Sequence, residues 1–364
     1  MTFNIPDGGP YLLAHSVGLL PQTARARLDA AVLDPWAHKG GDAWTDWLAV
    51  IDDFRAGIAR VIGARLEDVC PQANVSAGLF ALLSGLPRQN GKDVLLASAH
   101  SFPTIGFVME QAQRLGFRME LLPEQRSPGD ADVWAEAMRD DVAAVIAMHV
   151  HSNTGVVAPV ANICALARQR GIVSIIDVAQ STGIMPVDPE AWDADALVGS
   201  CLKWLCGGPG AGWLWANPKT TRDFKPLTVG WFSHENPFAF DIRDFRYAPD
   251  ARKFWGATPA VAPFALASAG VHLIADIGQT TVFSHNRRLI VQVAEAAPRW
   301  SDQFDRTHKG GTICLNADAE TTAIEARLKA AGCRFDRRGD TLRLSFHLWN
   351  TDEDADVVAG CLSV

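Results

Sequence analysis

The chain has 364 residues, of which 48% are hydrophobic and 20% charged, and acidic residues outnumber basic ones by 41 to 33, giving a net charge of −8. This length predicts about two domains with a large buried core, and the acidic balance argues against a dedicated nucleic-acid binder or a basic membrane-surface protein. No apolar stretch is long enough for a membrane span, and the N-terminus lacks the pattern of a secretory signal. Seven irregularly spaced cysteines without a CxxC pair favour reduced thiols in the cytoplasm and no metal site.

The first predicted elements lie in the N-terminal third. An amphipathic pattern predicts a long helix over Trp44–Ile62.

From about residue 70 to 216, short apolar runs then alternate with longer amphipathic ones. The predicted strands are Asp93–Ala97, Arg118–Leu122, Val142–His149, Ile172–Asp177, Ala196–Cys201 and Ala211–Trp215. The helices between them are Gly78–Leu86, Thr104–Leu115, Val133–Arg139 and Val160–Arg170. This alternation predicts an α/β fold with a mostly parallel sheet and helices on both of its faces.

The pattern changes past about Pro263, where a smaller α+β domain is expected. Its predicted elements are helices up to Ile277 and over Val282–Ala296 and Thr321–Ala331, with strands Gly310–Leu315 and Thr341–His347. The expected division is an N-terminal segment, residues 1–40, that packs on the small domain, a large domain, 41–260, and a small C-terminal domain, 261–364.

Two side chains that follow predicted strands carry the chemistry. Asp177 ends one strand, and Lys203 follows the next one among apolar neighbours. Taken singly, each has an ordinary interpretation: Asp177 as a cap of the next helix or turn, and Lys203 as a surface amine. Taken together, they match pyridoxal phosphate, which needs an amine for its aldehyde and a carboxylate to keep its ring nitrogen protonated. Ligands of open parallel sheets bind beyond the carboxyl ends of the strands, so the two side chains could meet on one ring.

The phosphate of such a coenzyme needs a helix N-terminus with free N–H groups. The stretch Asn74–Gly78 (NVSAG) precedes an apolar helix and offers the Ser76 hydroxyl. An ordinary serine cap has the same pattern, and spacing does not separate the two interpretations.

The sequence around both residues resembles fold-type-I pyridoxal-phosphate enzymes of the class V aminotransferase group, and within it the kynureninases. The resemblance rests on SIIDVAQSTGIMPVD and GSCLKWLCGGPG, and on further collinear segments spread over nearly the whole chain. These further segments include NVSAGLFALLSGL, SFPT, HVHSNTG, GWFSHE, FWGATPAV and RLSFHLWNTDEDAD. The fold it implies is a seven-stranded-type, mostly parallel sheet with a smaller C-terminal α+β domain.

The resemblance also implies the roles of the residues around the coenzyme. Lys203 would form the internal aldimine and move the α-proton, and Asp177 would pair with the ring nitrogen. The remaining implied contacts are Phe102 on the ring face, Val75 and Ser76 on the phosphate, and Gln180 near the ring oxygen.

Other implied roles lie farther along the chain. Trp231 and Thr258 match positions that reach the phosphate from a neighbouring subunit, which implies a homodimer with shared active sites. Arg343 matches the arginine that binds the substrate α-carboxylate, a task suited to a guanidinium fork. His234 could assist at the substrate, or form a structural hydrogen bond instead.

The expected function is therefore that of a class V aminotransferase-like enzyme acting on the α-amino group of an amino acid. Kynureninase-type hydrolysis and β-elimination of the cysteine desulfurase kind are the alternatives, and a non-enzymatic regulator is disfavoured because Lys203 and Asp177 are both present. Leu202, Gln180 and Ile105 stand where kynureninases carry tyrosine, histidine and aspartate, which weakens the hydrolytic alternative. The twelve tryptophans leave an aromatic substrate open.

Overall fold

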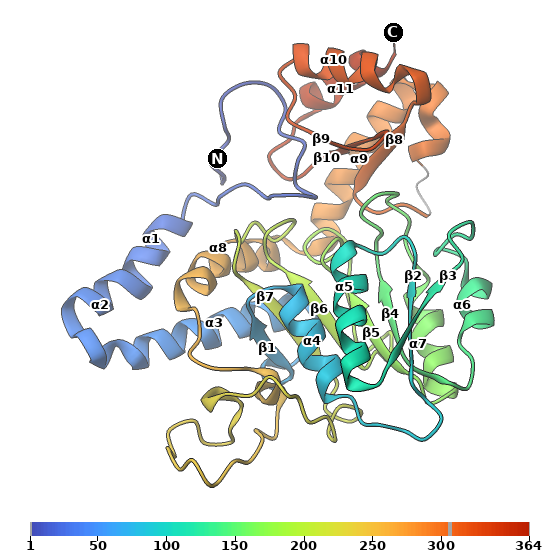
Figure 1. Ribbon diagram of the computed structural model, residues 1–364. Helices are drawn as coiled ribbons and strands as arrows, with labels where there is room; N and C mark the ends of the chain where they lie inside the picture. Colours follow the sequence, from blue (N-terminus) through green and yellow to red (C-terminus); the bar gives the residue numbers. More distant parts are fainter. Residues whose placement is uncertain (1, 305–307, 364) are drawn as a thin grey trace.

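The computed structural model describes residues 2–304 and 308–363 and contains a seven-stranded sheet with a smaller three-stranded sheet above it (Figure 1). The strands of the large sheet are β1 (Val69–Gln72), β2 (Val94–Ser98), β3 (Arg118–Leu122), β4 (Val142–Met148), β5 (Val173–Asp177), β6 (Ala196–Ser200) and β7 (Gly212–Ala216). Its helices are α1 (Ala24–Leu28), α2 (Asp34–Lys39), α3 (Trp44–Ile62), α4 (Val75–Gly85), α5 (Pro103–Ala112), α6 (Ala131–Ala137), α7 (Val160–Gln169) and α8 (Val261–Ile277). The small sheet consists of β8 (Thr312–Asn316), β9 (Asp336–Arg338) and β10 (Thr341–Ser345), with helices α9 (Gln279–Ala296), α10 (Thr321–Ala330) and α11 (Asp352–Leu362).

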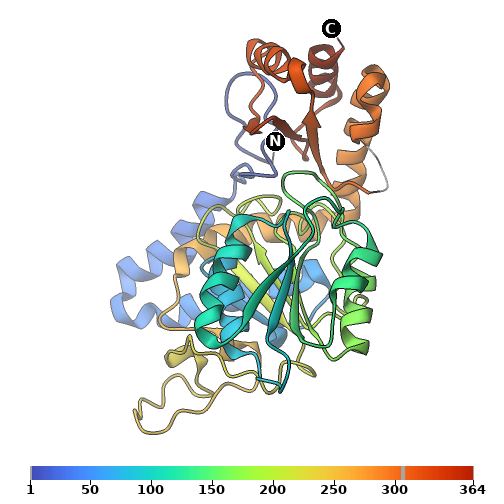
Figure 2. The same cartoon turned by 45° about the vertical axis from the view of Figure 1, so that its right-hand side comes forward.

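The large sheet has the order β1-β7-β6-β5-β4-β2-β3, and the five strands from β6 to β3 are parallel to one another. β7 runs antiparallel to both of its neighbours, β6 and β1. Helices α4 and α5 pack together on one face, and α6 and α7 pack together on the other (Figure 2). Because both faces are covered, every residue of β4 is buried, as its continuous apolar sequence predicts. The α/β prediction with a mostly parallel sheet is confirmed.

The small sheet has the order β8-β10-β9 and is antiparallel throughout. The N-terminal segment joins it: the Leu12 amide donates to the Arg334 carbonyl at 2.8 Å, and the Leu12 side chain is buried in the small-domain core. Helix α8, by contrast, lies along α3, and its buried side chains belong to the core of the large sheet. The domain division at residues 40 and 260 stays a prediction.

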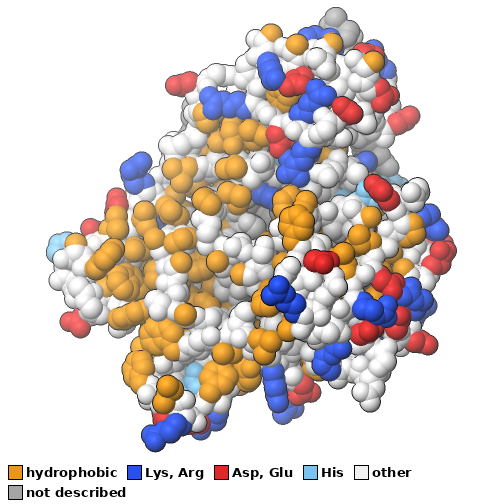
Figure 3. All heavy atoms as spheres, in the orientation of Figure 1, with side chains coloured by type: hydrophobic (Ala, Val, Ile, Leu, Met, Phe, Trp, Pro, Cys, Tyr) orange, Lys and Arg blue, Asp and Glu red, His pale blue; other side chains and the backbone are white. Residues whose placement is uncertain are grey.

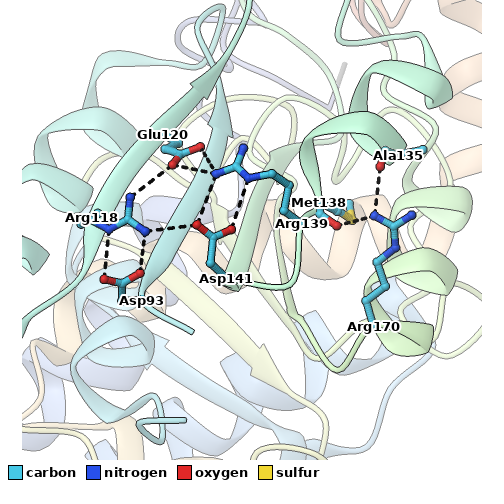
Figure 4. A network of polar contacts seen from close by, with 8 residues as sticks. All are labelled: Asp93, Arg118, Glu120, Ala135, Met138, Arg139, Asp141 and Arg170. Carbon is cyan, nitrogen blue, oxygen red and sulfur yellow. Dashed lines mark hydrogen bonds and ion pairs between the residues drawn. The ribbon is translucent and has the colours of Figure 1, made fainter. Parts of the chain in front are cut away.

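Charged residues at the start of the parallel strands form a network (Figure 4). Arg118, the first residue of β3, binds both oxygens of Asp93 at 2.8 and 3.0 Å and reaches Asp141 at 3.1 Å, and Arg139 binds Glu120 at 2.7 Å. These side chains are about one-third to one-half exposed, so each pair contributes little to stability. The network marks the amino ends of β2, β3 and β4, which is the edge opposite Asp177.

Within residues 2–304 and 308–363, no single helix is both long enough and apolar enough to span a bilayer. Helices α8 and α9 meet that criterion only when taken together as a pair bent by 82°.

Candidate active site

Asp177 and Lys203 lie at the carboxyl ends of two adjacent parallel strands. Asp177 is the last residue of β5, its backbone paired with Val198 of β6, and Lys203 follows the end of β6 by three residues. The Lys203 Nζ atom is 5.8 Å from the ring centroid of Phe102, which caps the amino end of α5. The structure therefore brings together the carboxylate, the amine and the aromatic ring that the sequence indicates.

Burial shifts the protonation of both groups. It raises the pKa of Asp177, opposed by the Ala179 N–H that donates to Oδ1 at 2.8 Å and by the Lys203 charge. It lowers the pKa of Lys203, where the Asp177 charge acts in the opposite sense and the charges of Arg338 and Arg343 lower it further. A lysine amine that is more readily deprotonated is a better nucleophile.

The residues present fit pyridoxal phosphate. Within the part of the chain that the structure describes, no ion pair joins Asp177 to Lys203, so a buried carboxylate and a buried amine lie near each other without neutralising one another in contact. The ring nitrogen of the coenzyme would complement the carboxylate, and its aldehyde would complement the amine.

The phosphate end of the coenzyme is matched by the start of α4. The Asn74 side chain caps this helix by accepting the Ala77 N–H at 2.9 Å, and the first turn carries no acidic residue. The amides of Val75 and Ser76 come first in the helix, where an N–H has no acceptor within the helix itself. Gly212 permits this arrangement, since a Cβ atom there would lie 2.8 Å from the Asn74 Cα atom.

Glycines let neighbouring segments approach the loop of residues 201–207, which we call the lysine loop. A Cβ atom on Gly18 would lie 2.1 Å from the Lys203 carbonyl oxygen, and one on Gly270 would lie 2.1 Å from that of Leu205. The Gly18 amide also donates to the Leu202 carbonyl at 2.8 Å. The lysine loop is thus held by the N-terminal segment on one side and by α8 on another.

We expect Gly270→Ala to destabilise the protein by about 1–3 kcal/mol, because the added methyl group must push the lysine loop away from α8. Gly360→Ala is the matched control: it also lies within a helix, but nothing is within 4 Å of its Cβ position. That substitution should stabilise by about 0.5–1 kcal/mol. Urea unfolding of both variants measures the difference, and equal effects would contradict this account of the loop.

A stack of rings joins the lysine loop to the small domain. The His347 ring lies between the indoles of Trp204 and Trp349, at centroid distances of 5.9 and 4.5 Å, and its Nε2 pairs with the Trp204 carbonyl at 3.1 Å. The Trp204 indole donates to Gln180 Oε1 at 3.3 Å, and Gln180 Nε2 donates to the His15 carbonyl at 3.1 Å. The Gln180 amide is thus engaged by protein groups, and its role near the coenzyme stays a prediction.

Arg343 lies on β10 with its side chain fully buried. Its Nε donates to Asp336 Oδ1 at 2.7 Å, its Nη2 also binds Asp336, and its Nη1 donates to the Ser152 carbonyl at 3.0 Å. Asp336 in turn contacts His15 Nε2 at 3.2 Å. Sequence reasoning does not identify this carboxylate partner, because Asp336 lies on a short edge strand that carries little pattern, and His15 comes from the distant N-terminal segment.

Three predicted residues, Trp231, Thr258 and His234, form hydrogen bonds with groups other than Lys203 and Asp177. Trp231 Nε1 donates to Thr258 Oγ1 at 3.3 Å, and His234 Nε2 pairs with the Asp244 carbonyl at 2.8 Å. Among the described residues, none of the three contacts Lys203 or Asp177. Their roles at the coenzyme and the substrate stay predictions.

Buried histidines surround the site, and we expect them to make the protein acid-sensitive. Burial lowers the pKa values of His15, His149, His151 and His347 to about 4. The unfolded chain binds protons on these rings below about pH 6.5, so it takes up more protons than the native state and the free energy of unfolding falls as pH drops toward 4. Urea unfolding should show a loss of several kcal/mol over this range, with a smaller slope for His151→Phe. A stability that does not change between pH 7 and 5 would contradict the prediction.

Comparison with known proteins gives consistent results. The family model "Aminotransferase class-V" matches residues 39–299. A kynureninase of Deinococcus radiodurans is 31% identical over 283 residues, which cover 76% of this chain and 68% of that protein. A kynureninase of Pseudomonas fluorescens is 29% identical over 300 residues, covering 79% and 69% of the two chains.

Solved structures share the fold. The cystine C–S lyase C-DES in complex with cysteine persulfide has a TM-score of 0.84 at 22% identity, with 97% of each chain covered. An apo cysteine desulfurase from Thermococcus onnurineus has a TM-score of 0.82 at 20% identity, covering 98% of this chain and 94% of that one.

Proposed function

The chain belongs to the class V aminotransferase family of pyridoxal-phosphate-dependent enzymes, and from this premise we propose that it acts on the α-amino group of an amino acid at Lys203. The observation that carries the proposal is the buried Lys203 amine, which lies near the Asp177 carboxylate without an ion pair between them. When bound, the coenzyme condenses with amines and accepts the electron pair of a broken bond at the substrate α-carbon into its ring.

Each residue has a separate task in this proposal. Lys203 Nζ carries the coenzyme before substrate arrives and afterwards takes the proton from the substrate α-carbon. Asp177 holds the proton on the ring nitrogen, and its burial strengthens that interaction by lowering the local dielectric. Phe102 positions the ring, and the amides of Val75 and Ser76 with the Ser76 hydroxyl bind the phosphate. Arg343 binds the substrate α-carboxylate through donors that Asp336 and Ser152 do not occupy.

Aminotransfer requires only these groups, so it is the reaction we propose first. The test is to incubate the holoprotein with amino acids and follow the visible absorbance and the products. Release of an oxo acid, together with the aminated form of the coenzyme, supports aminotransfer. A holoprotein whose spectrum does not respond to any α-amino acid contradicts the proposed function.

Kynureninase-type hydrolysis is the second candidate, favoured by the kynureninases among the relatives. It predicts anthranilate release from kynurenine in the same assay. A desulfurase reaction needs a reactive thiolate, and burial raises the pKa of Cys314, the cysteine paired with Arg343 across the small sheet, to about 11. All seven cysteines are buried and free, which supports a cytoplasmic location and makes sulfide the product we least expect.

We further propose a homodimer with shared active sites, formed through a hydrophobic face of the chain. Hydrophobic side chains gather over α1–α3 and over the loop between β7 and α8 (Figure 3). In that loop, Phe240 is 77% and Ile242 98% exposed, and Phe240 stacks on Trp231. Exposed apolar patches of this kind mark interfaces, and a second copy of the chain would cover the rings beside Trp231 and Thr258.

The dimer proposal is tested with the double variant Phe240→Asp/Ile242→Asp. Sedimentation should show a monomer, and the variant should bind the coenzyme more weakly, because Trp231 and Thr258 would no longer reach a partner's phosphate. Val357→Asp, which changes an exposed side chain on α11, is the control and should remain dimeric. A monomer that binds the coenzyme as tightly as wild type would contradict the shared site.

A further inference from the structure

Arg338 is a cation at the candidate active site that forms no ion pair with a carboxylate of the described residues. It is the last residue of the edge strand β9, and its guanidinium carbon lies 5.5 Å from the centroid of the Phe102 ring. Its Nη1 donates to Asn153 Oδ1 at 3.1 Å, and no carboxylate within residues 2–304 and 308–363 lies in ion-pair contact with it. The side chain remains exposed, so a ligand can reach it.

The preceding residue shows what an ordinary surface arginine does here. Arg337 binds Glu325 at 2.8 Å and Asp340 at 3.1 Å, so its charge is compensated by carboxylates of its own domain. Arg338 instead reaches across to the large domain, where, among the described residues, it contacts an amide oxygen and an aromatic face. An aromatic face attracts a cation without neutralising it.

The position of Arg338 relative to the reacting amine is set by a shared ring. Lys203 Nζ lies 5.8 Å from the centroid of the same Phe102 ring that Arg338 covers. The Arg338 charge also acts on Lys203, where it contributes to lowering the amine pKa. A group bound by Arg338 would therefore be part of the molecule that reacts at Lys203.

Among the described protein side chains of the site, the positive charges exceed the negative charges by one. Asp336 forms its ion pair with Arg343 and acts on Arg338 through its charge, and Asp177 is the carboxylate near Lys203. A neutral α-amino acid enters as a zwitterion and adds no net charge, so it would leave Arg338 as it is. An amino acid with an acidic side chain adds one negative charge, which matches the excess.

We propose that Arg338 binds a second acidic group of the substrate, and that the substrate is accordingly an α-amino acid with a carboxylate or similar anion on its side chain. This inference rests on the proposed function, in which the amine reacts at Lys203 and Arg343 binds the α-carboxylate. A guanidinium binds a carboxylate through two parallel hydrogen bonds, and the contacts with Asn153 and Phe102 hold the Arg338 side chain in place for it.

The test compares isosteric pairs of amino acids on the holoprotein. Dissociation constants are read from the change in coenzyme absorbance for aspartate against asparagine and for glutamate against glutamine. In at least one pair, wild type should bind the acidic member about 10-fold or more tightly, as a charge-assisted hydrogen bond requires. Arg338→Gln should reduce that preference to less than about threefold, whereas Arg337→Gln, the matched control, should keep it.

A second readout does not depend on the amine. Succinate, which has two carboxylates and no amino group, should raise the midpoint of thermal unfolding of the wild-type holoprotein but not that of Arg338→Gln. Equal binding within both amino-acid pairs, or loss of the preference in Arg337→Gln as well, overturns the inference while leaving the proposed function intact. If succinate binds and its binding requires Arg338, but no α-amino acid changes the coenzyme absorbance, the proposed function is overturned instead. If neither succinate nor any amino acid binds, both fail.

Discussion

Lys203→Ala should abolish the covalent attachment of the coenzyme. In the wild-type holoprotein, borohydride reduction should fix the coenzyme to the peptide that contains Lys203, and the variant should yield no labelled peptide. Turnover of any amino acid should fall by at least about 10³-fold, since the variant loses both the amine that holds the coenzyme and the base at the α-carbon. Mass spectrometry of the reduced, digested protein and a turnover assay measure the two effects.

A second buried lysine provides the control for this variant. Lys253 Nζ donates to the carbonyls of Thr221 and Arg222, both at 2.9 Å, and its side chain is largely buried. Lys253→Met should lower stability, because it leaves those two carbonyls without their donor, but should keep the labelled Lys203 peptide. Label found on Lys253 in the wild type, or retained in Lys203→Ala, would contradict the assignment of the reactive amine.

The large sheet could be predicted from the sequence because short apolar runs indicate most of its strands. The run Val142–Met148 is continuously apolar, and the run Ile172–Asp177 is apolar except for Ser174 and its final aspartate. β4 and β5 lie at the predicted positions to within a residue. In a parallel sheet, residues that follow the strands share one edge, so Asp177 and Lys203 could be placed together before the structure was known. The first strand, β1 (Val69–Gln72), was not predicted, since four residues that contain a proline carry little pattern.

The contacts of the small domain could not be predicted, because they depend on packing between distant segments. Arg343 stands in an alternating strand, but nothing nearby in the sequence indicates that Asp336 neutralises it or that His15 contacts this carboxylate. Arg338 and Arg337 are adjacent and chemically identical, and only the fold turns one toward Glu325 and the other toward Phe102. A sequence pattern gives the face on which a side chain lies, whereas its partner is decided by the tertiary structure.

Asp177→Asn should have opposite effects on the protein without and with its coenzyme. In the apoprotein the carboxylate is buried, and among the described residues it accepts a hydrogen bond from the Ala179 N–H alone. Burial raises its pKa, so the native state holds a proton that the unfolded chain releases, and the free energy of unfolding falls as pH rises from about 4 through the raised pKa. An uncharged amide of the same size removes this cost, and the apo variant should be more stable than apo wild type at pH 7.

The holoprotein should respond in the other direction, because the amide cannot hold a proton on the ring nitrogen. We expect turnover to fall by about 100-fold or more and coenzyme binding to weaken. The variant loses a negative charge that is positioned against the ring nitrogen in a site shielded from water. Asp195→Asn is the control: this carboxylate is equally buried and ends no strand, and it binds Ser174 and Arg168 away from Lys203. It should destabilise the apoprotein and leave the turnover of correctly folded enzyme unchanged. If the Asp177→Asn apoprotein is more stable but turnover stays normal, Asp177 lies near the coenzyme without acting on it. If the Asp177→Asn apoprotein is less stable than wild type, the Asp177 charge is already compensated before the coenzyme binds.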